Sequence, residues 1–259
     1  MKTSDHHLTA EKLKNIPIAR LVPNILTMLA LCSGLTAMRF AFAGDWPHAA
    51  LAIVVASVFD ILDGRVARLL GLTSKFGAEL DSLADLTNFG VVPALVLYLW
   101  ALQGTSLGWI AVLVYAVCTA TRLARFNTML EDHTAPAWAK CYFTGVPSPA
   151  GAGIALLPLF VVLEFGPDYQ LPQVMLSLWL ILAGLLMVTR MPTLSMKGRK
   201  ISHVWVAPIM AAACLLVAAL ITDPFLALSV LAVGYIVCLP YGWICYRRQE
   251  RQEQQQSQP

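Results

Sequence analysis

Charged residues are scarce in this sequence. Only 13% of the 259 residues are Asp, Glu, Lys or Arg, whereas 58% are hydrophobic and the mean hydropathy is +0.68. Soluble globular domains carry charge on roughly a quarter of their residues. The composition therefore excludes an ordinary soluble domain and indicates an all-α, polytopic membrane protein.

Several other signatures are missing. The six cysteines show no CxxC pair and no regular spacing, which argues against a disulfide framework. The five histidines form no cluster, so neither a zinc nor a copper site is predicted. No apolar run closely follows the first basic residue, so the start of the chain does not resemble a signal peptide. No internal repeat of fixed period is present.

Long apolar runs are what the sequence has instead. Each can span about 30 Å of hydrocarbon at 1.5 Å per residue, so we expect about eight transmembrane helices. They cover residues 22–42, 47–70, 77–102, 106–129, 148–166, 171–189, 203–221 and 225–246. We expect one transmembrane catalytic domain at 21–246. Residues 1–20 are expected to form a cytoplasmic segment, either an interfacial helix or a disordered tail, and 247–259 a disordered cytoplasmic tail.

Lysine and arginine gather at alternate connections between these runs. They occur in the first 20 residues, after the second, fourth and sixth runs, and in the C-terminal tail. The connections near Asp45, Gly104, Asp168 and Asp223 have none. The positive-inside rule therefore places both termini, and the turn after the second run, in the cytoplasm.

Four aspartates interrupt the second and third runs. Asp60 and Asp63 are three residues apart and Asp81 and Asp85 four apart, so each pair shares a helix face. One charged Asp in a bilayer helix costs roughly 2.5–3.5 kcal/mol, and four would cost about 10 kcal/mol without compensation. A bound cation is the simplest compensation. Oxygen ligands suit Mg²⁺, Mn²⁺ or Ca²⁺, and four carboxylates carry charge enough for two ions.

Acidic residues inside a membrane also occur in ion-coupled transporters. A transporter is expected to spread its acids over several helices near the bilayer midplane. Here the acids lie in consecutive helices near the predicted cytoplasmic ends, with glycines and an arginine between them. This arrangement favours an active site open to a cytosolic substrate and leaves a cation-coupled transporter as the remote alternative.

The motif around the aspartates reads Asp60-x2-Asp63-Gly64-x2-Ala67-Arg68-x8-Gly77-x3-Asp81-x3-Asp85. It resembles the signature of the CDP-alcohol phosphotransferases, with every position present. The text that follows, Asn88-Phe-Gly90 and Pro93-Ala94, is similar to that of bacterial integral-membrane members that use serine. The resemblance implies the family's all-helical fold.

The resemblance also implies a reaction. A hydroxyl attacks the phosphorus of CDP-diacylglycerol next to the lipid and CMP leaves, with L-serine as the expected acceptor and glycerol 3-phosphate as the alternative. Two divalent cations, Mg²⁺ or Mn²⁺, are expected on Asp60, Asp63, Asp81 and Asp85, with Asp85 as the catalytic base. Because a carboxylate beside cations is a weak base, Asp85 could orient the hydroxyl as much as deprotonate it. A homodimer in the bacterial inner membrane is expected.

Seven further positions are expected to bind CDP-diacylglycerol. Glycine lets a nucleotide approach the backbone, and a guanidinium suits bidentate phosphate contact. The set comprises Asn24, Thr27, Gly64, Ala67, Arg68, Ser74 and Gly77. Alternative roles stay open: close helix packing for the small residues, a membrane anchor for the arginine, and simple helix-start roles for Asn24 and Thr27.

Arg122 and Arg125 share a helix face at the cytoplasmic end of the fourth run. Our hypothesis is that one of them binds the serine carboxylate or a substrate phosphate, with interfacial snorkelling as the alternative. Arginines alone do not identify the acceptor, because relatives that use phosphorylated alcohols also need basic residues. Under this hypothesis, Arg125→Ala raises the KM for the acceptor more than that for CDP-diacylglycerol.

Overall fold

The computed structural model describes residues 21–71, 74–131, 142–189, 192–194 and 206–256. The predicted cytoplasmic segment 1–20 lies outside these residues. Within the described ranges nearly all of the backbone is helical, and the two strands are three residues long each. The all-α prediction is therefore confirmed.

The helical segments match the predicted apolar runs closely. They are α2 (Val22–Phe42), α3 (Trp46–Leu69), a continuous run of α4 (Lys75–Asp85), η2 (Leu86–Val91), α5 (Val92–Leu97) and η3 (Tyr98–Leu102), then α6 (Ser106–Glu131), α7 (Ser148–Phe165), the short η5 (Pro167–Tyr169), α8 (Gln173–Val188), α9 (Val206–Thr222) and α10 (Pro224–Gln256). With the run from Lys75 to Leu102 taken as one, the long segments fit the expected count of about eight. Strands β1 (Tyr142–Thr144) and β2 (Pro192–Leu194) pair antiparallel.

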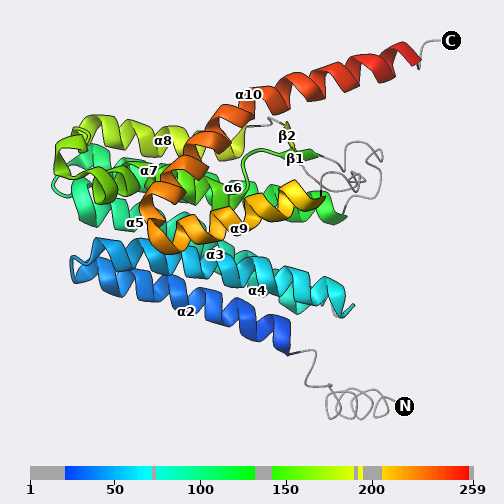
Figure 1. The fold of residues 1–259 in the computed structure, drawn as a ribbon. Coiled ribbons are helices and arrows are strands. Elements are labelled where there is room, and N and C mark those ends of the chain that lie inside the picture. Colours follow the sequence, from blue (N-terminus) through cyan, green and yellow to red (C-terminus); the bar gives the residue numbers. More distant parts are fainter. Residues whose placement is uncertain (1–20, 72–73, 132–141, 190–191, 195–205, 257–259) are drawn as a thin grey trace, which may run out of the picture.

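The long helices lie side by side in one bundle (Figure 1). The start of α2, the α3–α4 connection, the end of α6 and the end of α10 all lie at the same end of the bundle, on the right of the view. The turn from α2 to α3 and the connection from α7 to α8 lie at the other end. This up-and-down arrangement is the one that the alternation of basic connections predicts.

Small residues let α2 and α3 pack closely. The buried face of α2 includes Ala30, Gly34 and Ala37, and that of α3 includes Ala49 and Ala56. Small side chains are typical of helix contacts in membranes, because they let two backbones approach. In the turn before α3, Asp45 caps the helix through the His48 N–H, and its hydrogen bonds to His48 lower the pKa of the Asp45 carboxyl.

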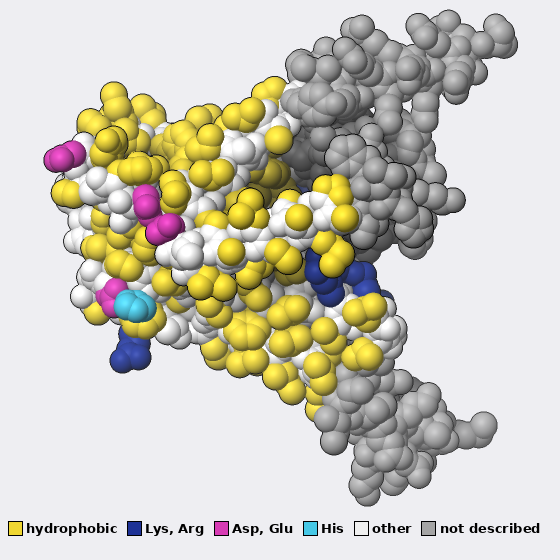
Figure 2. Space-filling view, in the orientation of Figure 1, with side chains coloured by type: hydrophobic (Ala, Val, Ile, Leu, Met, Phe, Trp, Pro, Cys, Tyr) yellow, Lys and Arg dark blue, Asp and Glu magenta, His cyan; other side chains and the backbone are white. Residues whose placement is uncertain are grey.

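Apolar side chains are spread over the described part of the surface, where charged side chains are few (Figure 2). By length and apolar composition, four described helical segments could cross a membrane: Val22–Phe42, Lys75–Leu102, Ser106–Thr128 and Ser148–Phe165. Three shorter apolar helices accompany them, Gln173–Val188, Ala207–Thr222 and Pro224–Pro240. Helix α3 is of similar length but carries the charges of the aspartate motif. The protein is an integral membrane protein.

The C-terminal end differs from expectation. We expected disorder over 247–259, but α10 continues as a helix to Gln256. The reason lies in residue type, because the glutamine, glutamate and arginine residues that dominate this stretch are good helix formers. Polarity alone predicts exposure to water and not the loss of helical structure.

Candidate metal and substrate site

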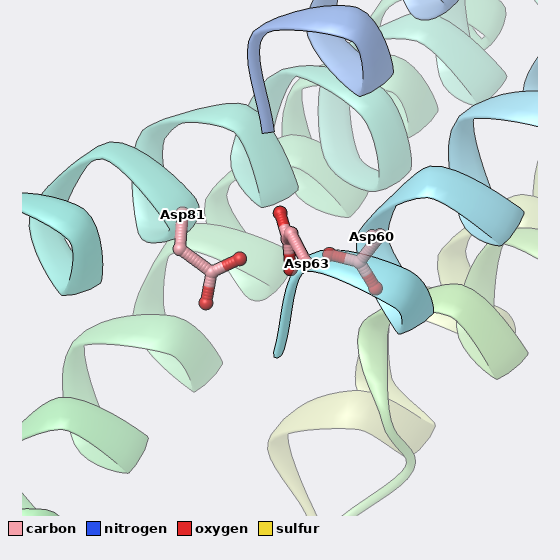
Figure 3. Close-up of side chains that lie close together, drawn as sticks. All are labelled: Asp60, Asp63 and Asp81. Atoms are coloured by element: carbon pink, nitrogen blue, oxygen red, sulfur yellow. The ribbon is translucent and has the colours of Figure 1, made fainter. Parts of the chain in front are cut away.

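Three of the four motif aspartates converge on one space between α3 and α4 (Figure 3). One carboxylate oxygen from each of Asp60, Asp63 and Asp81 lies within 4.8 Å of those of the other two. Asp63 is buried, and Asp60 and Asp81 are half-buried. Like charges this close repel unless a cation or a proton lies between them. An all-oxygen set of this kind fits a hard divalent cation.

Asp85 completes the cluster one helical turn after Asp81. Its carboxyl group lies close to that of Asp60, and its charge interacts with those of Asp60 and Asp81. The Asp85 Oδ1 atom is buried without a hydrogen-bond partner among the described residues. A buried carboxylate oxygen needs a partner. This atom therefore fits an absent ligand, either a cation or a hydroxyl group.

The connection between α3 and α4 determines how the two aspartate pairs are oriented toward one another. Helix α3 ends at Leu69 and α4 begins at Lys75. Ser74 caps α4 by accepting a hydrogen bond of 3.0 Å from the Gly77 N–H. A Cβ on Gly77 would lie 3.0 Å from the Asn24 Oδ1 and 3.1 Å from the Ser74 Oγ, both tight contacts. Asn24, Ser74 and Gly77 thus meet beside the cluster, as three of the predicted substrate-binding residues.

Thr27 contacts the cluster directly. Its hydroxyl oxygen lies 2.5 Å from Asp63 Oδ2 and 3.1 Å from the Pro23 carbonyl oxygen of its own helix. A hydroxyl placed in this way fixes the orientation of a ligand carboxylate. The predicted contact of Thr27 with the nucleotide stays a prediction, and the structure adds a partner that the sequence did not indicate.

Arg68 folds back over the glycine of the motif. A Cβ on Gly64 would lie 3.6 Å from one terminal nitrogen of the Arg68 guanidinium, an ordinary contact distance. The exposed Arg68 carries its charge close enough to interact with Asp63 and Asp81, and Ala67 is half-buried beside it. A cation at the rim of an acidic cluster suits a phosphate that bridges the two.

The two arginines of α6 have different partners. The half-buried Arg122 donates to the Ser148 hydroxyl at the start of α7, and its charge interacts with that of Asp85. Its Nε is buried without a hydrogen-bond partner among the described residues. Arg125 donates instead to the Val188 carbonyl oxygen at the end of α8, at 2.8 Å. Arg122 therefore lies beside Asp85 of the candidate site, whereas Arg125 links α6 to α8.

The sequence predicted no role for two polar residues near the site. Ser148 holds Arg122, and Asn127 donates to the Ser82 hydroxyl at 2.9 Å, which links α6 to α4 beside Asp81. Their only signal was position, since both lie at the predicted cytoplasmic ends of helices. Their partners lie 26 and 45 residues away along the chain, beyond the reach of helical periodicity.

Comparison with known proteins agrees with this geometry. A family model described as CDP-alcohol phosphatidyltransferase matches residues 20–190, which include all four aspartates and both arginines. A second, described as CDP-alcohol phosphatidyltransferase 2, matches residues 204–240.

Several relatives carry the name CDP-diacylglycerol–serine O-phosphatidyltransferase, including the following three. The one from Mycobacterium leprae is 40% identical over 224 residues, which cover 86% of this chain and 74% of the relative. The one from Helicobacter pylori strain J99 is 30% identical over 227 residues, covering 86% and 91%. The one from Saccharomyces cerevisiae is 35% identical over 162 residues, covering 60% and 57%.

Proposed function

This chain belongs to the CDP-alcohol phosphatidyltransferase family, and we propose that it transfers the phosphatidyl group of CDP-diacylglycerol to L-serine, giving phosphatidylserine and CMP. The observation that carries the proposal is the convergence of the motif aspartates on one space. The acceptor rests on the names of the relatives, which match most of the chain. A cation-coupled transporter has no support beyond the presence of buried acids.

The reaction needs one proton transfer and one exchange of bonds at phosphorus. The serine hydroxyl oxygen bonds to the phosphorus next to the lipid, and the bond from that phosphorus to the bridging diphosphate oxygen breaks. CMP leaves with that electron pair, and the hydroxyl proton passes to Asp85. The buried Oδ1 of Asp85, which has no partner among the described residues, can accept this hydrogen bond. Alignment and charge neutralisation supply most of the catalysis in reactions of this kind.

We propose that Asp60, Asp63, Asp81 and Asp85 hold two divalent cations, Mg²⁺ or Mn²⁺. Bound there, such cations neutralise the diphosphate and the leaving phosphate. Thr27 orients Asp63 from α2. Arg68, at the exposed rim, contacts the diphosphate, and the small residues Gly64, Ala67 and Gly77 leave room for the nucleotide, with Asn24 and Ser74 donating to it.

Arg122 is the residue that we propose for the carboxylate of the acceptor. It faces Asp85, so an amino acid between them has its hydroxyl at the base and its carboxylate at the guanidinium. Its Nε, which has no partner in the part of the chain that the structure describes, supplies the donor that this contact needs. The same cation would accept the phosphate of glycerol 3-phosphate, which is the alternative acceptor.

The cellular setting follows from charge and family. We propose that both termini and the site face the cytoplasm of a bacterial inner membrane, because basic residues gather at that end. A cytoplasmic site meets a cytosolic amino acid and a lipid of the inner leaflet. A homodimer is proposed on the family resemblance alone.

The test is CMP release by the purified protein in detergent. CDP-diacylglycerol and Mg²⁺ or Mn²⁺ are supplied with serine, glycerol 3-phosphate or inositol phosphate in separate reactions. We expect release with serine alone and its loss in Asp85→Asn. Asp168→Asn, in the remote η5 turn, is the matched control and should retain activity. CMP release only with another alcohol would support phosphatidyl transfer but refute serine as the acceptor. If no alcohol gave CMP release, both the transfer reaction and the serine assignment would be refuted.

A further inference from the structure

Tyr115 of α6 binds a backbone carbonyl of the π-helix that follows Asp85. Its hydroxyl donates a hydrogen bond of 3.0 Å to the Phe89 carbonyl oxygen in η2. In an α-helix this carbonyl would accept from the N–H four residues later, but that residue is Pro93, which has no N–H. Tyr115 and Phe89 are fully buried, so bulk water does not supply the missing donor. The neighbouring helix supplies it instead, through the Tyr115 hydroxyl.

The same arrangement recurs at a second proline, away from the aspartates. Pro158 lies inside α7, and the carbonyl oxygen four residues before it belongs to Ile154. This oxygen accepts a hydrogen bond of 2.9 Å from the indole N–H of Trp179 on α8. A proline in a membrane helix is tolerated where a neighbouring helix satisfies the carbonyl that it frees. Neither α7 nor α8 carries an aspartate of the cluster, so this second bond provides a comparison for the first.

The bond from Tyr115 also sets the register between η2 and α6. Gly90, the residue after Phe89, faces α6, because a Cβ there would lie 3.0 Å from the Thr119 Cγ2. Thr119 lies one turn after Tyr115 and donates its hydroxyl to the Tyr115 carbonyl oxygen at 2.9 Å. Helix η2 therefore packs on two successive turns of α6, with a directional hydrogen bond at one turn and a close contact at the other.

From this contact both helices lead to groups of the proposed reaction. Asp85 lies four residues before Phe89, which is about 6 Å along a helix. Arg122 lies seven residues after Tyr115, which is about two turns or 10 Å, so the two share a face of α6. The two helices run in opposite directions, and both steps lead toward the charged end of the bundle (Figure 1). There the charges of Asp85 and Arg122 interact.

We propose that Tyr115 is a positioning residue for the transfer reaction, because its bond to the Phe89 carbonyl fixes η2 against α6 and thereby places Asp85 relative to Arg122. The inference rests on the proposed function, in which these two groups hold the hydroxyl and the carboxylate of the acceptor. Pro93 leaves the helix one backbone donor short, so the register of the turn after Asp85 depends on a partner outside the segment. Tyr115 acts through the backbone and not through contact with the substrate.

The test removes one aromatic donor at a time. Tyr115→Phe is compared with Trp179→Phe, which removes the same kind of bond between α7 and α8. The Tm in detergent is measured, together with kcat and KM for serine-dependent CMP release. Each variant loses one hydrogen bond to a freed carbonyl, so both should lower the Tm by a few degrees. We expect kcat to fall about tenfold in Tyr115→Phe alone, with the KM for CDP-diacylglycerol nearly unchanged, because small displacements of reacting groups slow a reaction strongly.

Mn²⁺ binding separates this proposal from the proposed reaction. It is measured without substrates, from the electron paramagnetic resonance signal of free Mn²⁺. Because Asp85 is a proposed cation ligand, Tyr115→Phe should weaken Mn²⁺ binding about tenfold and Trp179→Phe should leave it unchanged, even if no alcohol gives CMP release. Unchanged Mn²⁺ binding or unchanged kcat in Tyr115→Phe, or equal losses in Trp179→Phe, would refute the positioning role.

A second variant changes the same contact without altering the tyrosine. Should Tyr115→Phe fail to fold, Gly90→Ala adds a methyl group that presses on Thr119 and moves η2 away from α6. It must then give the same pattern of a lower kcat, weaker Mn²⁺ binding and a nearly unchanged KM for CDP-diacylglycerol. Normal kcat and Mn²⁺ binding in Gly90→Ala would show that the register between η2 and α6 does not control the site.

Discussion

A single hydroxyl links α2 to the aspartate cluster. Thr27 is buried and lies 2.5 Å from the Asp63 carboxylate. Partners of metal ligands typically change metal affinity by 10–100-fold when removed. We expect Thr27→Val to raise the Mg²⁺ or Mn²⁺ concentration for half-maximal activity by about tenfold. The measurement is a metal titration of CMP release.

The control for this prediction lies on the same helix. Thr36 is exposed, and its hydroxyl donates to the Cys32 carbonyl oxygen one turn away. Thr36→Val removes the same hydroxyl without touching the cluster, so its metal requirement should match that of the unmodified protein. Equal titration curves for the two variants would show that Thr27 does not support Asp63.

Arg122 and Arg125 should behave differently when altered. Arg122→Gln removes the charge that faces Asp85 and holds Ser148. Because charged hydrogen bonds contribute about 1.5–3 kcal/mol, the KM for serine should rise roughly 10- to 100-fold, with a much smaller change for CDP-diacylglycerol. Arg125→Gln loses a bond to Val188 and should lower the Tm without that difference in KM. A selective rise in the KM for serine in Arg125→Gln would reverse the assignment.

The different partners of these two arginines show what could not be predicted from the sequence for single residues. The aspartates were predictable, because i,i+3 and i,i+4 spacing puts each pair on one face and burial of charge demands a partner. The arginines obey the same spacing rule, yet one bonds to α7 and the other to α8. Which of two neighbours reaches the site depends on helices that lie far along the chain.

Among the elements, the π-helix η2 begins directly after Asp85. Its buried Asn88 packs against Gly34 of α2, where an added Cβ would clash with the Asn88 Oδ1 and lie 2.9 Å from its Cγ. π-helical turns are often found at functional sites. The contact fixes the position of η2, and therefore of the helical turn that carries Asp85, relative to α2.

Gly34→Ala tests this contact. The new methyl group must displace Asn88 in a closely packed region, and overpacking of this kind costs about 1–3 kcal/mol. We expect a lower Tm in detergent and reduced CMP release. Gly234→Ala provides the control, because its Cβ meets nothing and alanine favours a helix. An unchanged Tm in Gly34→Ala would mean that Asn88 moves aside without cost.

Hydropathy predicted the positions of the helices, but it did not predict the π-helical turns within them. The predicted run 77–102 corresponds to a helical segment from Lys75 to Leu102, within which η2 and η3 are π-helical. Residues Leu86–Val91 contain no proline, and hydropathy alone does not distinguish a π turn from an α turn. The close approach of Gly34 and Asn88, which involves α2, has no signal in the local sequence of η2.

At the scale of the whole molecule, the sequence predicted the arrangement through charge. In the sequence, every second connection between apolar runs is basic, and the aspartate motif lies at one of these connections. The structure places the start of α2, the α3–α4 connection and the end of α10 at one end of the bundle. What the sequence could not give was an apolar cavity between α3, α7 and α10, because it is formed by helices distant in the chain. Which side of the membrane the charged end of the bundle faces is tested by a separate experiment.

Cysteine labelling in intact cells addresses that question. The six native cysteines are replaced, and one cysteine is introduced at Lys75, at the start of α4, or at Asp168, between α7 and α8. An impermeant maleimide should label Asp168→Cys from outside and Lys75→Cys only after the membrane is opened, since basic connections are retained in the cytoplasm. The reverse pattern would put the aspartate cluster outside the cell, away from a cytosolic supply of serine and CDP-diacylglycerol. Labelling of both positions from outside would contradict an odd number of membrane crossings between them.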